Sequence, residues 1–293
     1  MIANSLTDDE LPAFLADLGI PGLFDVHVHF MAPPVLAKVQ AYFDSVGPLL
    51  GRPWPITYRG TDDERVEQLR RMGVRWFSSL SYAHKPGIAQ FLNDWTADFA
   101  AQTPDTLWSG TFYPEPEASD YVPTLIDAGV EIFKAHMQVG NFAADNPLLD
   151  PVWSAIEAAG TPVVLHAGSG PAPGDHTGPE SVERVLARFP KLRLVIAHLG
   201  SPETDEFLDL ADRYDELRLD LTMEFTGWFG EELPDRLPSR LADLQKRLLF
   251  GSDFPNIPYQ YAHQVGALAR LEPGDDWLRD VLWRNGASLF GKD

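Results

Sequence analysis

Short runs of β-forming residues alternate with longer amphipathic segments along the whole chain. Eight such runs occur, at residues 23–30, 74–81, 106–113, 130–137, 162–168, 192–200, 217–224 and 247–254. The segments between them space their apolar residues as helices do, for example at 62–73, 147–160 and 179–190. Eight strand–helix units in one chain predict an α/β fold, a closed (β/α)₈ TIM barrel. A doubly wound open sheet is the alternative, but no GxGxxG motif follows the first run to favour it.

The helical segments have recognisable ends. Thr61 followed by Glu64 has the spacing of a capping box, which satisfies backbone N–H groups at the start of a helix. Gly73, Gly129 and Gly160 lie where helices should stop, because glycine readily adopts the left-handed backbone of a helix terminus.

The domain organisation predicted from the sequence is simple. We expect residues 1–293 to form a single TIM-barrel domain, with 1–21 as an N-terminal extension packed outside the barrel. Two stretches rich in proline and glycine, 46–60 and 168–179, are expected to be loops over a site rather than domain boundaries. They should be more mobile than the strands and should become ordered when substrate binds.

Charge and composition exclude several functions. The chain has 43 acidic against 23 basic residues, a formal net charge of −20, so it repels nucleic acid and anionic membrane surfaces. It has no cysteine, so any metal must be held by His, Asp, Glu or a modified Lys. No apolar run approaches the ~20 residues of a membrane helix, and the first residues do not resemble a signal peptide. We therefore expect a cytoplasmic protein that acts on a small molecule; whether it is a homo-oligomer stays open.

Histidines and carboxylates gather at the ends of the predicted strands. They are His27, His29, His136, His166, His198, Glu224 and Asp253. Strand ends converge on one face of a barrel, where active sites are built. Because side chains alternate along a strand, Asp25, His27 and His29 should share one face. Histidines and carboxylates in such numbers predict a metal site.

The motifs FDVHVHF, FKAH, LHAG, IAHLG and GSDFP together resemble those of the amidohydrolase superfamily. The resemblance runs from about residue 23 to residue 290. It is to the amidohydrolase-related branch, which includes the aminocarboxymuconate-semialdehyde decarboxylase-like enzymes. It implies a TIM barrel with a divalent metal at its mouth, held by His27, His29, His166 and Asp253. His198 would orient or deprotonate the reacting water, or bind a second metal, and Asp253 would accept a proton and pass it to the leaving group.

Two residues of the fourth run leave alternatives open. The resemblance implies that Lys134 is either carboxylated, bridging two metals, or unmodified, in a salt bridge with Asp25 or Glu115. His136 is a metal ligand, a substrate contact or a hydrogen-bonded barrel histidine.

Glu224 departs from the family pattern. On the seventh run Asp220, Thr222 and Glu224 should share a face, with Glu224 at the barrel mouth. As an additional ligand it would allow a second ion; as a loop carboxylate it would face water or an arginine. One or two ions per chain, Zn, Mn or Fe, suit such a mixed set of ligands. The two-ion form resembles TIM-barrel nonheme diiron monooxygenases.

These observations give three hypotheses for the function. The first is metal-dependent hydrolysis, in which an activated water attacks a C–N or C–O bond of a small organic substrate. The second is a diiron monooxygenase that hydroxylates an apolar substrate, such as a natural-product or CoA-linked compound. The third is a nonoxidative metal-dependent decarboxylase.

Overall fold

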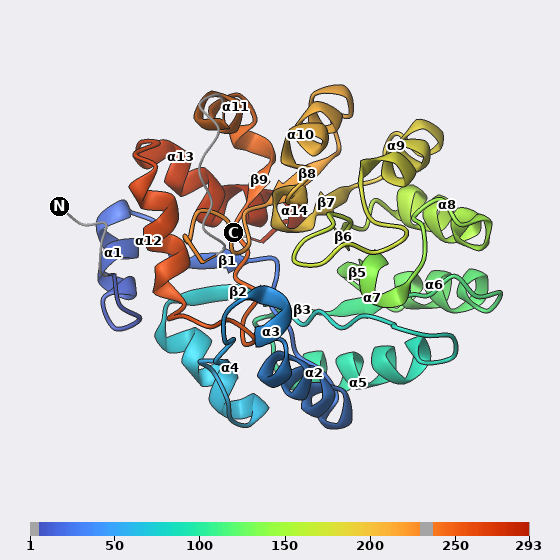
Figure 1. The fold of residues 1–293 in the computed structure, drawn as a ribbon, viewed down its shortest axis with the longest axis horizontal. Coiled ribbons are helices and arrows are strands. Elements are labelled where there is room, and N and C mark those ends of the chain that lie inside the picture. Colours follow the sequence, from blue (N-terminus) through green and yellow to red (C-terminus); the bar gives the residue numbers. More distant parts are fainter. Residues whose placement is uncertain (1–5, 229–236, 293) are drawn as a thin grey trace. The chain divides into compact units, whose positions relative to one another are not determined.

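The computed structural model describes residues 6–228 and 237–292 (Figure 1). The chain packs as two compact units. Met1–Phe77 and Leu221–Asp293 form the first unit, and Ser78–Asp220 forms the second. No helix of the described residues is long and apolar enough to cross a membrane.

The second unit is a parallel sheet flanked by helices. The sheet contains β4 (Ser109–Thr111), β5 (Ile132–His136), β6 (Val163–His166), β7 (Leu194–Ile196) and β8 (Arg218–Asp220). A further short strand of the unit, β3 (Thr106–Leu107), is not part of this sheet. Strands β4 to β8 pair in chain order, each parallel to the next. Strands β6 and β7 are buried throughout and apolar except for His166, as expected of parallel strands covered on both faces.

Helices of this unit alternate with its strands. They are α5 (Ala89–Gln102), α6 (Ala118–Asp127), α7 (Met137–Gly140), α8 (Asp150–Ala159), α9 (Pro179–Arg188) and α10 (Thr204–Arg213), with short 3₁₀ turns at Pro147–Leu149 and Ala197–Gly200. In Figure 1, α6, α8, α9 and α10 lie along the outer side of β5, β6 and β7. This is the repeated strand–helix order that the sequence predicts.

The first unit combines both ends of the chain. Its elements are α1 (Leu11–Leu18), β1 (Leu23–Asp25), α2 (Pro33–Ser45), α3 (Gly47–Leu50), α4 (Asp62–Arg71), β2 (Val74–Ser78, which ends across the unit boundary), α11 (Leu237–Asp243), β9 (Leu248–Leu249), α12 (Ala262–Arg270), α13 (Asp275–Arg279) and α14 (Asn285–Phe290), with a 3₁₀ turn at Gln245–Arg247 and a π-helical turn, η4, at Asp280–Arg284. Strand β1 pairs with β2 in parallel, with Asp25 opposite Phe77.

The helix ends agree with the prediction from sequence. The Thr61 hydroxyl accepts from the Glu64 N–H at 3.3 Å, and the Glu64 carboxylate accepts from the Thr61 N–H at 2.8 Å, so the capping box is formed. Gly160 ends α8 with φ 67°, and Gly73 and Gly129, just after α4 and α6, have φ of 85° and 99°. Each glycine therefore takes up the backbone conformation that terminates its helix.

The N-terminal segment packs within the first unit through α1. Leu11, Leu15 and Leu18 are buried along one face of this helix. The Leu18 carbonyl accepts a hydrogen bond of 2.7 Å from Arg279 Nε at the end of α13. That residues 1–293 form one domain stays a prediction.

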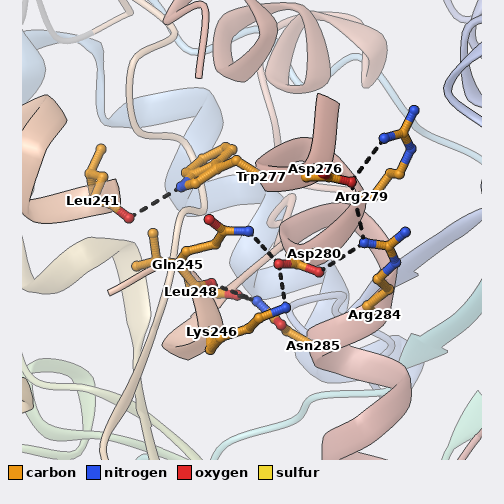
Figure 2. A network of polar contacts seen from close by, with 10 residues as sticks. All are labelled: Leu241, Gln245, Lys246, Leu248, Asp276, Trp277, Arg279, Asp280, Arg284 and Asn285. Atoms are coloured by element: carbon orange, nitrogen blue, oxygen red, sulfur yellow. Dashed lines mark hydrogen bonds and ion pairs between the residues drawn. The ribbon is translucent and has the colours of Figure 1, made fainter. Parts of the chain in front are cut away.

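A buried carboxylate joins the C-terminal helices to the segment before β9 (Figure 2). Asp280, 1 % exposed, accepts from Lys246 Nζ at 2.5 Å, from Arg284 at 3.3 Å and from the Gln245 amide. Asn285 Nδ2 donates to the carbonyls of Gln245 and Leu248, each at 2.8 Å. These bonds connect η4 and α14 to the start of β9.

The predicted runs are longer than the observed strands, and the third run is two strands. Strands β3 and β4 are separated at Trp108. The Trp108 N–H donates to the carboxylate of Glu131 at 3.1 Å, so it does not continue the ladder. A side-chain acceptor thus interrupts a run that composition alone predicts as continuous.

The seventh run also ends early. Strand β8 stops at Asp220, and Met223 and Phe225 have φ of 65° and 64°. The Glu224 N–H donates to the Leu221 carbonyl at 3.3 Å, which closes a turn. The prediction that Asp220, Thr222 and Glu224 lie along one face of a continuous strand is therefore wrong, because the left-handed residues end the alternation.

Candidate metal centre

Two histidines and an aspartate meet in the first unit. His29 Nε2 lies 2.9 Å and His27 Nε2 lies 3.6 Å from Asp253 Oδ1. Among the described residues, these three offer ligand atoms that all lie within 4.8 Å of one another. Ligands placed tetrahedrally at ~2.0–2.2 Å from a zinc-like ion are roughly 3.3–3.6 Å apart. The donor types and their spacing therefore fit a divalent ion.

Backbone pairing brings the two ligand-bearing segments together. Beyond β1, the Val26 N–H donates to the Phe250 carbonyl at 3.0 Å. The Asp253 N–H donates to the His27 carbonyl at 2.8 Å, and the His29 N–H donates to the Phe254 carbonyl at 2.7 Å. The first and eighth predicted runs thus continue side by side after their regular strands end.

The backbone at Asp253 and the close packing at Gly251 restrict which residues can occupy these two positions. Asp253 has φ 66°, a left-handed conformation that aspartate tolerates better than most residues. A Cβ at Gly251 would lie 2.1 Å from Thr222 Oγ1 and 2.7 Å from His27 Cβ. Only glycine leaves room for His27 and Thr222 to meet at this point.

Thr222 orients the His27 ring. Its Oγ1 lies 3.2 Å from His27 Nδ1. For Nε2 to offer its lone pair to a metal, Nδ1 must carry the proton and donate it to the Thr222 hydroxyl. Partners of this kind fix the tautomer and the direction of a metal-binding histidine.

Asp25 accepts hydrogen bonds from both segments that carry the candidate ligands. Its fully buried Oδ1 accepts from the His27 N–H at 3.1 Å and from the Ser252 N–H at 3.2 Å. Its Oδ2 accepts from the Tyr261 hydroxyl at 2.6 Å. Burial, together with the charge of Asp25, raises the pKa of Tyr261 well above its ordinary value, so this hydroxyl stays protonated and donates.

In the second unit, three predicted site histidines lie in contact. His136 and His166 are paired in the β5–β6 register, and their rings stack with centroids 3.9 Å apart. The His198 ring lies edge-on to His166 at 4.9 Å. The strand-end histidines of β5, β6 and β7 therefore converge as expected for adjacent parallel strands.

Backbone contacts hold each of these histidines. His136 Nδ1 accepts from the Val139 N–H at 3.4 Å at the start of α7, and His166 Nε2 donates to the Gly170 carbonyl at 3.0 Å. His198 lies just beyond β7 with φ 55°, and its N–H donates to Asp220 at 2.9 Å. The Val139 contact does not decide among the three predicted roles of His136, which stay open. The roles of His166 as a ligand and of His198 as a base or ligand stay predictions.

Lys134 and Glu224 are both buried. The Lys134 carbonyl accepts from Thr111 Oγ1 at 2.8 Å, and the Glu115 carboxylate, one of its two predicted partners, accepts from the Gly87 N–H at 2.6 Å and from the Tyr121 hydroxyl at 3.1 Å. Neither carboxylation nor a salt bridge of Lys134 is tested by these contacts. Glu224 does not belong to the three-residue cluster of described ligand atoms, so its role as a ligand also stays a prediction.

The loop 46–60 is anchored by aromatic residues. Trp54 is buried, its Nε1 donates to the Asn256 carbonyl at 2.7 Å, and its ring meets that of Trp228 at 6.1 Å. Arg52 lies over the Trp228 ring at 5.1 Å. These contacts tie the loop to Asn256, in the segment that follows Asp253, and to Trp228. The mobility of this loop, and that of 168–179, stays a prediction.

Comparison with known families identifies the class of the protein. A family model described as amidohydrolase matches residues 24–292, so the chain belongs to the amidohydrolase family, a family of enzymes. The superfamily predicted from the strand-end motifs is thereby confirmed. No curated protein matches the chain.

Solved structures match nearly the whole chain. An uncharacterised TIM-barrel protein from Bordetella bronchiseptica has a TM-score of 0.73 at 21 % identity, covering 92 % of this chain and 98 % of that one. A 5-carboxyvanillate decarboxylase from Novosphingobium aromaticivorans, solved with manganese, has 0.65 at 14 %, covering 98 % and 100 %. A probable 2-pyrone-4,6-dicarboxylic acid hydrolase from Acinetobacter baumannii has 0.59 at 16 %, covering 92 % and 99 %. The fold is a TIM barrel, as the sequence predicts.

Proposed function

We propose that this chain is a metal-dependent hydrolase that cleaves a C–N or C–O bond of a small organic substrate. The observation that supports this is the cluster of His27, His29 and Asp253, whose ligand atoms lie within 4.8 Å of one another. Two neutral imidazoles and one carboxylate leave a divalent ion with residual positive charge and with positions open to water and substrate.

Within this proposal the residues of the cluster have two different roles, holding the ion and transferring a proton. A divalent ion supplies Lewis acidity, which lowers the pKa of water towards ~7 and polarises a substrate oxygen. His27 and His29 are almost completely buried and serve to hold the ion, whereas the Asp253 side chain is 14 % exposed. Asp253 is therefore the member of the cluster best placed to accept a proton from water and return it to a leaving group.

One ion, Zn or Mn, fits this cluster better than two irons. Among the described residues, no second group of three ligand atoms gathers in the same way. Of the similar structures named above, the two whose names state an activity are a hydrolase and a decarboxylase. The diiron monooxygenase hypothesis thus gains no support.

Nonoxidative decarboxylation is the second candidate. The observation that favours it is the likeness, over 98 % of this chain, to a decarboxylase of an aromatic carboxylate solved with manganese. The same cluster suits this reaction, since His27, His29 and Asp253 would hold a divalent ion that would supply Lewis acidity to an oxygen of the substrate. The two reactions differ in what leaves the substrate, and this difference makes them separable by experiment.

The test measures how many metal ions each chain binds and whether an oxygen atom from water enters the product. Protein purified without added metal, then loaded with Zn²⁺ or Mn²⁺, is assayed against small amides, lactones and aromatic carboxylates in H₂¹⁸O. We expect one ion per chain and incorporation of ¹⁸O into the product. His27→Ala with His29→Ala should lose both the ion and turnover, because two of the three ligands are gone. His176→Ala, at an exposed loop histidine outside the cluster, is the control for metal content and should still bind one ion.

Each other outcome identifies a different function. Release of CO₂, with no ¹⁸O in the organic product, would establish the decarboxylase instead. Two irons per chain, with oxygen uptake and loss of one iron in Glu224→Gln, would establish the monooxygenase. A double variant that retains its metal and its turnover would disprove the assigned cluster.

A further inference from the structure

A line of hydrogen bonds runs from the N-terminal segment to the metal cluster within the first unit. The Tyr58 hydroxyl donates to Asp8 Oδ2 and accepts from the backbone N–H of Tyr261 at 2.6 Å. The Tyr261 hydroxyl donates to Asp25 Oδ2 at 2.6 Å. Asp25 Oδ1 then accepts from the backbone N–H of the proposed ligand His27.

Each carboxylate in this line bridges two segments that are far apart in the sequence. Asp8 receives the Tyr58 hydroxyl from the loop 46–60 and, at 2.9 Å, the N–H of Ala262 at the start of α12. Asp25 receives the N–H of His27 and, at 3.2 Å, the N–H of Ser252, which precedes Asp253. At its last carboxylate, Asp25, the line therefore holds the backbone of both segments that carry the cluster.

The direction of these bonds is fixed. Tyr58 is 8 % exposed, and burial, followed by the hydrogen bond and charge of Asp8, raises the pKa of its hydroxyl far above the ordinary value. The pKa of Tyr261 is also raised, first by burial and then by the charge of Asp25. Both hydroxyls therefore remain protonated, and each donates to a carboxylate that can only accept.

A buried carboxylate is costly unless its oxygens are satisfied. Asp25 is fully buried, and it accepts hydrogen bonds from the Tyr261 hydroxyl and from the backbone N–H groups of His27 and Ser252. Removing the hydroxyl of Tyr261 takes a 2.6 Å donor away from Oδ2, and this loss favours a rotation or shift of the carboxylate. Because the same carboxyl group holds His27 and Ser252, such a movement displaces the ligand backbones.

We propose that Asp8, Tyr58 and Tyr261 are positioning residues of the metal centre, which act through Asp25 on His27 and Asp253. The segment before α1 is then part of the site's support rather than a detachable extension. The inference rests on the proposed function in that the ion occupies the His27–His29–Asp253 cluster. The hydrogen-bond line itself does not depend on the ion.

The test compares conservative variants by two measurements. The first is the dissociation constant for Zn²⁺, measured by competition with a chromophoric chelator. The second is hydrogen exchange at the amides of His27 and Ser252 in metal-free protein. We expect about tenfold weaker binding in Tyr261→Phe, the lower end of the range for partners that bond metal ligands directly. Asp8→Asn should cost less, about threefold, because Asp8 is further from the ligands along the hydrogen bonds. Exchange at both amides should accelerate in each variant.

Matched controls and a double variant separate positioning from general destabilisation. Asp9→Asn changes the same charge at an exposed neighbour, and Tyr42→Phe removes the hydroxyl of a tyrosine that is 51 % exposed. Neither should change the Zn²⁺ constant or the exchange at His27. Asp8→Asn combined with Tyr58→Phe should bind no more weakly than the worse single variant, because both break one line.

The outcomes are distinguishable. If wild type binds Zn²⁺ and the Asp8, Tyr58 and Tyr261 variants match the controls in both measurements, the inference is overturned. If wild type binds no divalent ion, the proposed function fails, and exchange at His27 alone decides whether the line positions this backbone. Should Tyr261→Phe not fold, Asp8→Asn at the periphery gives the same two measurements.

Discussion

At the scale of single residues, the proposed metal centre depends on Gly251, because any side chain at this position would collide with Thr222 and His27. Gly251 lets Thr222 and His27 approach each other, and Thr222 in turn fixes the nitrogen that His27 presents. In Gly251→Ala the new methyl group would overlap both neighbours, at 2.1 Å and 2.7 Å. We expect a loss of about 1–3 kcal/mol in the free energy of unfolding from this overpacking. Zn²⁺ binding should weaken as well, because the new methyl group displaces the His27 side chain. Denaturant unfolding measures the loss of stability, and competition with a chelator measures the loss of Zn²⁺ affinity.

Gly266→Ala is the control for that substitution. Gly266 lies within α12, where a Cβ would meet only ordinary contacts at 3.5 Å and 3.8 Å. Alanine there should leave binding unchanged and raise stability slightly, since alanine favours a helix over glycine by about 1 kcal/mol. Equal behaviour of the two variants would show that the close approach at Gly251 is not required.

The residues of the site were predictable only in part. That His27, His29 and Asp253 lie together could be predicted, because motifs at strand ends indicate side chains that converge; their role as metal ligands stays a prediction. Thr222 and Tyr261 could not, because their contacts with His27 and Asp25 join residues 195 and 236 positions apart. No local pattern marks such partners, since only the folded chain brings them together.

At the scale of elements, composition predicts where strands lie but not where they end. Side-chain acceptors decide several ends: Asp25 takes the His27 N–H after β1, and Glu131 takes the Trp108 N–H between β3 and β4. Left-handed residues follow other strands within a few positions, Met223 after β8 and Asp253 after β9. Helix ends are more predictable, because capping boxes and terminal glycines are local signals.

The C-terminal helices give a prediction at this scale. Asp280→Asn should lower the free energy of unfolding by about 1–3 kcal/mol near neutral pH, because charge-assisted bonds from Lys246 and Arg284 are weakened. Burial opposes ionisation of Asp280, but its bonds with Lys246, Gln245 and Arg284 prevail and lower its pKa below the ordinary 3.8. The ionised group therefore stabilises the fold above that value, and the stabilisation is lost as pH falls through the lowered pKa.

Denaturant unfolding at several pH values checks this. The difference between wild type and Asp280→Asn should shrink as pH falls below about 4. Asp276→Asn, at a side chain that is 81 % exposed, should differ little from wild type at any pH. A difference for Asp280→Asn that persists undiminished into acid would contradict the assigned role of the charge.

At the scale of the whole molecule, the prediction of one domain and the division into two compact units lead to different unfolding behaviour. A ligand that binds only the native state stabilises whatever unfolds together with its site, by about 2.7 kcal/mol at a hundredfold excess over its dissociation constant. For a cooperative unit of this size, that corresponds to a rise in Tm of roughly 5–10 °C. His27, His29 and Asp253 all lie in the first unit.

Calorimetry with and without Zn²⁺ therefore tests the domain organisation and the metal site together. If residues 1–293 form one domain, a single transition should move as a whole when the ion is added. If the units unfold separately, two transitions should appear, and only the one that belongs to the first unit should move. In His27→Ala with His29→Ala no transition should respond, because the ligands are gone. A shift retained in that double variant would place the ion elsewhere in the chain, because only binding at another site could still stabilise the native state.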